Sequence, residues 1–157
     1  MDSYLVLKTL HILSATILIG TGAGIAFFMF MAARSKNIPA IYFTSKYVVL
    51  ADWIFTAPAI ITQLITGFLL MEDLGYSYNS PWFHWAIVLF IFIGLCWIPV
   101  VVIQYRLRNL AKTAVKTKQI DPEFYTLMRI WTLLGIPAFS AIILLLWIMV
   151  FKPFHIT

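Results

Sequence analysis

The chain has a single cysteine, Cys96, and it lies inside an apolar run. Neither a disulfide framework nor a CxxC pair can therefore form. Charged residues are also scarce, at 11% of the chain, against about 25% in an ordinary soluble domain. No glycine-rich phosphate loop, no Ser/His/Asp set and no carboxylate pair occurs. The sequence thus offers no motif for nucleotide binding or for hydrolysis.

Apolar residues, in contrast, make up 62% of the 157 residues, which excludes a soluble globule and a disordered chain. A helix needs about 20 apolar residues to cross the hydrocarbon core, and a backbone in lipid must satisfy its own hydrogen bonds. We therefore predict an all-α, single-domain protein, a four-transmembrane-helix up-down bundle over residues 1–157. The predicted spans are about 4–33, 47–71, 82–104 and 130–151.

The basic residues predict the orientation of this bundle, because cytoplasmic loops are enriched in Lys and Arg. Nine of the eleven basic residues fall in or next to the expected loops 34–46 and 105–129. The loop after the second span carries only Glu72 and Asp73. We expect loops 34–46 and 105–129 to be cytoplasmic and the N- and C-termini to be non-cytoplasmic. The expected location is a bacterial cytoplasmic membrane, with the first run as an uncleaved anchor and no nucleic acid as partner.

The three histidines, His11, His84 and His155, all fall toward the predicted outer side. His11 lies roughly 10 Å inside the start of the first span, at 1.5 Å per residue. Imidazole is a natural axial ligand of haem iron, and the first and third spans run in the same direction. We therefore expect His11 and His84 to be the metal ligands of a haem b, with copper as the alternative cofactor.

Two further polar residues are expected near this cofactor. Lys8 lies one turn above His11, toward the interface, where it would pair with a haem propionate. Gln63, in the second span, is expected near the depth of His11. The structural alternative is that each histidine bonds a neighbour or water near a helix end.

One acidic residue, Asp52, is expected at the inner end of the second span. An ion pair with Arg129, Arg34 or Lys46 is the expected way to satisfy its charge there.

Short motifs distributed over nearly the whole chain resemble known membrane families. The first span has Lys8-Thr9-Leu10-His11, the second has Thr56-Ala57-Pro58 followed by Gly67, and the third starts Trp82-Phe83-His84. Arg129, Pro137 and Lys152-Pro153-Phe154 fit the pattern of the fourth span. The chain is similar to the HemJ-type protoporphyrinogen oxidases and the copper-resistance CopD proteins. It resembles still more a bacterial membrane family of unknown function.

The resemblance to HemJ implies that His11 is a haem or porphyrin ligand. A haem-binding protein of electron transfer, with a membrane redox partner or as a homo-oligomer in the lipid bilayer, is the first hypothesis. A HemJ-like porphyrinogen oxidase is the second, and enzyme activity stays open. A non-catalytic membrane subunit, or a copper-handling CopD-like protein without haem, is the third.

Overall fold

The computed structural model describes residues 2–153, and every regular element in this range is helical. The elements are α1 (Asp2–Ser35), α2 (Ile38–Ala51), the π-helical turn η1 (Asp52–Thr56), α3 (Ala57–Asp73), α4 (Pro81–Thr117) and α5 (Pro122–Phe151). Helices α2 and α3 join through η1 into one rod, Ile38–Asp73. Within the described range, four helical rods are long and apolar enough to cross a membrane, which confirms the all-α fold.

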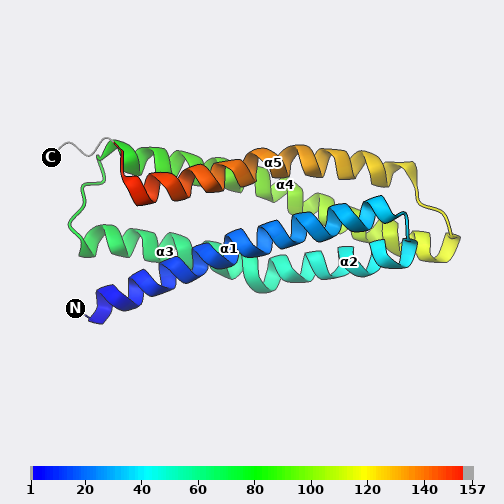
Figure 1. Cartoon of the computed structure of the whole chain (residues 1–157), viewed down its shortest axis with the longest axis horizontal. Helices are drawn as coiled ribbons and strands as arrows, with labels where there is room; N and C mark the ends of the chain where they lie inside the picture. The colour runs from blue at the N-terminus through cyan, green and yellow to red at the C-terminus, as the bar shows by residue number, and fades with distance from the viewer. Residues whose placement is uncertain (1, 154–157) are drawn as a thin grey trace.

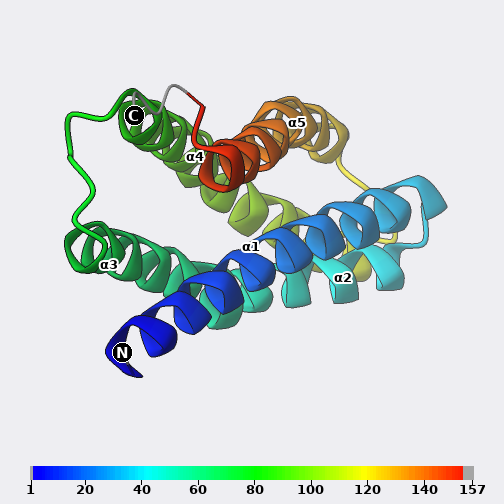
Figure 2. The same cartoon turned by 60° about the vertical axis from the view of Figure 1, so that its left-hand side comes forward.

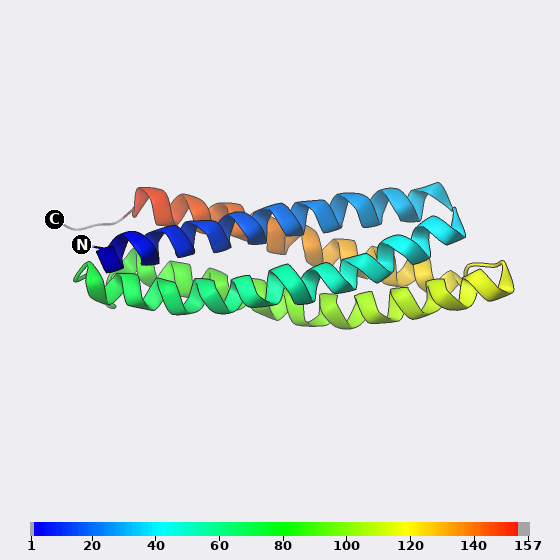
Figure 3. The same ribbon diagram turned by 90° about the horizontal axis from the view of Figure 1, so that it is seen from below.

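The rods form two layers along a common long axis (Figures 1 and 2). One layer is the pair α4 and α5, and the other holds α1 with the rod α2–η1–α3. Helix α1 packs on α2, α3 and α5, whereas α4 packs on α2 and α5. Figure 3 shows the rods running alternately up and down, so α1 begins where α5 ends. We call this end, with linker 74–80, the termini end, and the opposite end, with linkers 36–37 and 118–121, the basic end.

Helix caps explain where the rods begin. Asn37 accepts a hydrogen bond from the backbone N–H of Ala40 at 3.1 Å and starts α2. Asp121 accepts one from the N–H of Glu123 at 2.8 Å, and Pro122 occupies the first turn of α5. Both residues satisfy N–H groups that a helix start leaves without an intrahelical partner. The helices therefore extend well past the expected spans, and the linkers are shorter than the expected loops 34–46 and 105–129.

The larger core lies at the basic end, where four helices contribute buried side chains. Leu107 and Phe124 are completely buried there, and Met29 and Ile41 nearly so. A smaller cluster at the termini end joins Met71, Trp82 and Ile148. Helices α1, α2, α4 and α5 therefore share one core at the basic end, whereas α3 packs in the termini-end half through more local contacts.

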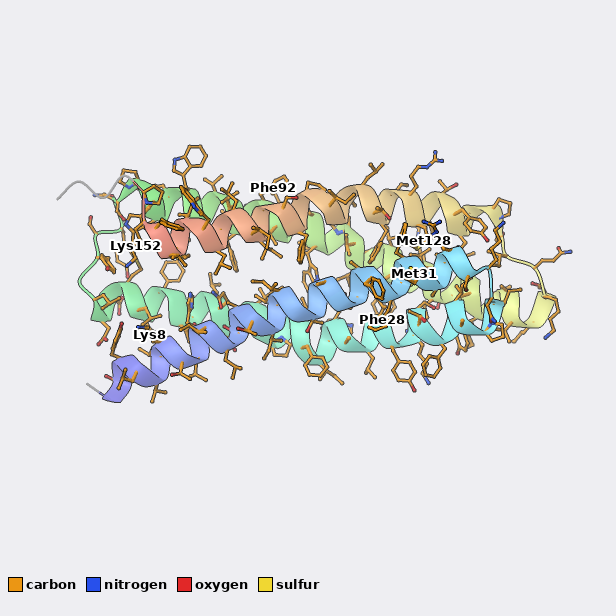
Figure 4. All side chains as sticks on the ribbon, viewed as in Figure 1. Lys8, Phe28, Met31, Phe92, Met128 and Lys152 are labelled. Carbon is orange, nitrogen blue, oxygen red and sulfur yellow. The ribbon has the colours of Figure 1, made fainter. Side chains whose placement is uncertain are left out.

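Large apolar side chains cover the outside of the rods. In Figure 4, Phe92 projects from α4, and Phe28 and Met31 lie on α1. Phe28 is 64% exposed and Phe92 is 42% exposed. A surface of this kind is suited to acyl chains rather than to water.

Candidate functional site

His11 lies in the termini-end half of α1, half-buried, where this helix packs on α3. Its ring contacts α3 through hydrogen bonds to Thr66 and Gln63. The structure therefore brings together two of the expected site residues, His11 and Gln63, and adds Thr66, which the sequence analysis missed.

The hydrogen bonds around the ring define which nitrogen carries the proton. Thr66 donates its hydroxyl hydrogen to the carbonyl oxygen of Thr62 at 2.6 Å, so Thr66 Oγ1 accepts from His11 Nδ1 at 2.9 Å. The amide Nε2 of Gln63, which can only donate, lies 2.9 Å from His11 Nε2. With Thr66 donating to Thr62 and the Gln63 nitrogen facing the ring, the network assigns to His11 the neutral tautomer that has its hydrogen on Nδ1 and a lone pair on Nε2.

Ser14, one turn after His11 on α1, fixes the orientation of the Gln63 amide. Its buried hydroxyl lies 2.5 Å from Gln63 Oε1 and 3.0 Å from the carbonyl oxygen of His11, and donation to the nearer Oε1 turns the amide nitrogen toward the imidazole. The network therefore runs from Ser14 through Gln63 and His11 to Thr66, and it joins α1 to α3. Its α3 members, Gln63 and Thr66, are three residues apart and share one helix face.

Gly67 provides the space for the imidazole. A Cβ atom at this position would lie 3.4 Å from Cε1 of His11. The absence of a side chain at Gly67 lets the ring lie close to the α3 backbone. The sequence had indicated Gly67 only as part of the motif of the second span, and not as the neighbour of His11.

The other expected site residues lie apart from this network. Lys8 is exposed, and its ammonium group lies 5.5 Å from the centroid of the Tyr4 ring. His84 is exposed in the first turn of α4, where Nδ1 bonds the carbonyl oxygen of Ser80 at 3.0 Å. His155 lies outside the described residues. Within the described range, the structure does not bring the rings of His11 and His84 into one site, nor gather three His, Cys, Asp or Glu residues.

A second polar cluster surrounds Asp52 at the π-helical turn. Asp52 is only 5% exposed, and the side chains of Thr56, Gln104 and Trp97 lie beside its carboxyl group. Asp52 Oδ2, Thr56 Oγ1 and Gln104 Oε1 nevertheless lack a hydrogen bond of good geometry. The cluster is thus a buried polar site with unsatisfied hydrogen-bonding groups inside an apolar protein, the arrangement that marks a functional candidate in a membrane.

The expected ion pair of Asp52 is wrong. Among residues 2–153, Asp52 pairs with none of Arg34, Lys46 and Arg129. The reason is that α2 adds 14 residues before Asp52, so the carboxyl group lies within a long rod and not at its end. The signal that could have found this is the Asn37-Ile38-Pro39 start of α2, because asparagine is a preferred N-cap and proline is tolerated in the first turn of a helix.

Comparison with known proteins identifies the family. Residues 5–153 match the model of a family described as a predicted integral membrane protein, DUF2269. The chain belongs to the DUF2269 family. No curated protein and no solved structure matches it. Membership of the DUF2269 family agrees with the four spanning helices and makes this a multi-pass integral membrane protein, but it adds no support for the finer likeness to HemJ or CopD.

Proposed function

We propose that this DUF2269 protein binds haem b in a bacterial cytoplasmic membrane, and that Nε2 of His11 would hold the iron. The observation that carries the proposal is the hydrogen bond between His11 Nδ1 and Thr66 Oγ1 at 2.9 Å, which leaves the lone pair of the neutral imidazole on Nε2. A ligating imidazole needs an unprotonated nitrogen toward the metal and a second nitrogen that donates to an oxygen. His11 Nδ1 meets the second requirement through Thr66, and Nε2 would meet the first once the Gln63 amide turns away.

The surroundings of His11 are compatible with this chemistry. Gly67 leaves the ring free to lie against the α3 backbone, and the half-buried position limits competition by water. A bound haem would supply one-electron transfer, and the chain would hold and orient it. Lys8, exposed one turn nearer the termini end, is the proposed charge partner of a propionate.

We expected Gln63 beside the cofactor, and in the proposed site it is instead the hydrogen-bond donor to Nε2 of His11. Its amide nitrogen occupies the direction in which the Nε2 lone pair points, at 2.9 Å. Ligation of a metal therefore competes with the hydrogen bond from Gln63, and the amide must turn away when a haem binds. The proposal does not include His84 as a second ligand, because its ring is exposed and bonded to the carbonyl oxygen of Ser80 at the start of α4.

The proposed orientation rests on the basic residues. Nine of the eleven Lys and Arg residues lie toward the basic end, which we assign to the cytoplasm. The His11 network then lies in the outer half of the membrane, where a membrane redox partner would exchange electrons with the haem.

Spectral titration of the purified protein with haemin tests the proposal. The wild type should develop a Soret band that saturates at one haem per chain, and His11→Ala should abolish it. His84→Ala is the matched control and should titrate like the wild type. A protein that stays colourless would mean that the network only packs α1 on α3. Saturable copper binding without haem would favour the CopD-like alternative.

A further inference from the structure

A groove of about 560 Å³ opens between the end of α1 and the start of α5, at the basic end. Three cations line it: Arg34 and Lys36 from the α1 side, and Arg129 from α5. Apolar side chains line the remainder, among them Phe30 and Leu133. The groove belongs neither to the His11 network nor to the Asp52 cluster.

The cations of the groove have no acidic partner. Within residues 2–153, no carboxylate forms an ion pair with Arg34, Lys36 or Arg129, and all three side chains are exposed. The guanidinium group of Arg34 lies over the ring of Phe30, 5.6 Å from its centroid. Three uncompensated positive charges around one groove attract an anion, and two guanidinium groups suit the oxygens of a phosphate.

Along both helices, cationic and apolar residues follow one another in the same order as the headgroup and the acyl chains of a phospholipid. Phe30 lies one turn before Arg34 on α1, and Leu133 lies one turn after Arg129 on α5, so both apolar residues lie deeper in the membrane than the cations. Phe30 is 44% exposed and Leu133 is 64% exposed. The cations thus stand at the height of headgroups and the apolar side chains at the height of acyl chains.

We propose that this groove binds one anionic glycerophospholipid. Its phosphate lies between Arg34 and Arg129, Lys36 adds a further positive charge, and its acyl chains lie along Phe30 and Leu133. Basic grooves between transmembrane helices on the cytoplasmic side bind such headgroups. A soluble phosphate compound would use the cations but would leave the apolar part of the groove in contact with bulk lipid.

Native mass spectrometry of the full chain in neutral detergent tests this site. Phosphatidylglycerol and phosphatidylcholine of identical acyl chains are added in equal amounts. We expect one phosphatidylglycerol per chain to be retained in preference to phosphatidylcholine. Arg34→Gln/Arg129→Gln should weaken this binding about thirtyfold, from the usual contribution of two basic residues near an anionic surface.

The control variant is Lys112→Gln/Lys116→Gln, which removes the same charge from exposed positions of α4 outside the groove. It should retain the lipid. Equal loss in both double variants, or equal retention of the two lipids, would overturn the proposal. Arg34→Lys/Arg129→Lys keeps the charge if the glutamine variant does not fold, and it should bind with intermediate affinity because the bidentate geometry is lost. Displacement of the lipid by equimolar inorganic phosphate would show a simple anion site and would also overturn it.

Discussion

The side-chain nitrogen of Gln63 lies 2.9 Å from Nε2 of His11, across the contact between α3 and α1. Both ring nitrogens of His11 are therefore bonded to α3, since Nδ1 bonds Thr66. A buried polar group costs little when its hydrogen bonds are complete and much when one is missing. The network thus holds the imidazole in one orientation, and under the proposed function only the Gln63 amide would have to move before Nε2 binds a metal.

Ser14→Ala tests the first bond of the network. Gln63 would lose the donor to Oε1 at 2.5 Å, and its amide would no longer be fixed toward His11. We expect a loss of about 1 kcal/mol in stability, or a melting temperature lower by about 2–4 °C in detergent. Thr16→Ala is the control, because the exposed Thr16 hydroxyl bonds only the carbonyl of Ile12 in its own helix. An equal effect of both substitutions would argue against a network.

Gly67→Leu tests the close contact between the ring and the α3 backbone. The Cβ alone would lie 3.4 Å from His11 Cε1, so the further atoms of a leucine should displace the ring and cost about 1–3 kcal/mol of stability through overpacking. Gly94→Leu is the matched control, because a Cβ on Gly94 meets no atom within 4 Å. Thermal unfolding of both variants should separate them clearly. Similar melting temperatures would mean that His11 can move away without cost.

Asp52→Asn tests the unsatisfied polar cluster at η1. A neutral amide costs less to bury than a carboxylate whose Oδ2 has no hydrogen bond. The substitution should therefore raise the melting temperature, by about 2–4 °C for each kcal/mol gained. Glu72→Gln, at an exposed position near the termini end, should leave it unchanged. A clear fall for Asp52→Asn would mean that the carboxylate has a partner, such as a cation or ordered water.

Single cysteines test the orientation of the bundle. In a Cys96→Ala background, Asn79→Cys places a thiol in linker 74–80 at the termini end, and Gln119→Cys places one in linker 118–121. A membrane-impermeant maleimide should label the first variant in intact cells and the second only after permeabilisation. The reverse pattern would place the His11 network in the cytoplasmic half of the membrane.

Much of the fold could be predicted from the sequence, because the length and spacing of the apolar runs determine the number and order of the spanning helices. Apolar length predicted the four spans, although α5 begins at Pro122, eight residues before the expected start at about 130. The extension of α2 back to Ile38 was missed, because hydropathy detects the part of a helix that lies in lipid and not the turns that continue beyond it. The cap at Asn37 was the available signal.

In the candidate site, the sequence predicted how deep each residue lies along its helix, but not the direction in which its side chain points. Depth is readable from sequence at about 1.5 Å per residue, and it predicted that Gln63 lies level with His11. Rotation of a helix about its axis depends on packing against its neighbours, and the sequence does not record it. His84 was therefore expected to face His11, although its ring is exposed on α4. The partner role of Thr66 was missed for the same reason.

The haem affinities of Gln63→Ala and Thr66→Val, measured by spectral titration beside the wild type, test whether Nε2 of His11 binds the haem. Gln63→Ala removes the competitor for Nε2 and should bind haem about fivefold tighter. Thr66→Val removes the acceptor that orients Nδ1 and should bind about 10–100-fold more weakly. Opposite shifts of this kind would identify Nε2 of His11 as the ligand. Unchanged affinity in both variants, or no haem binding by the wild type, would contradict the account.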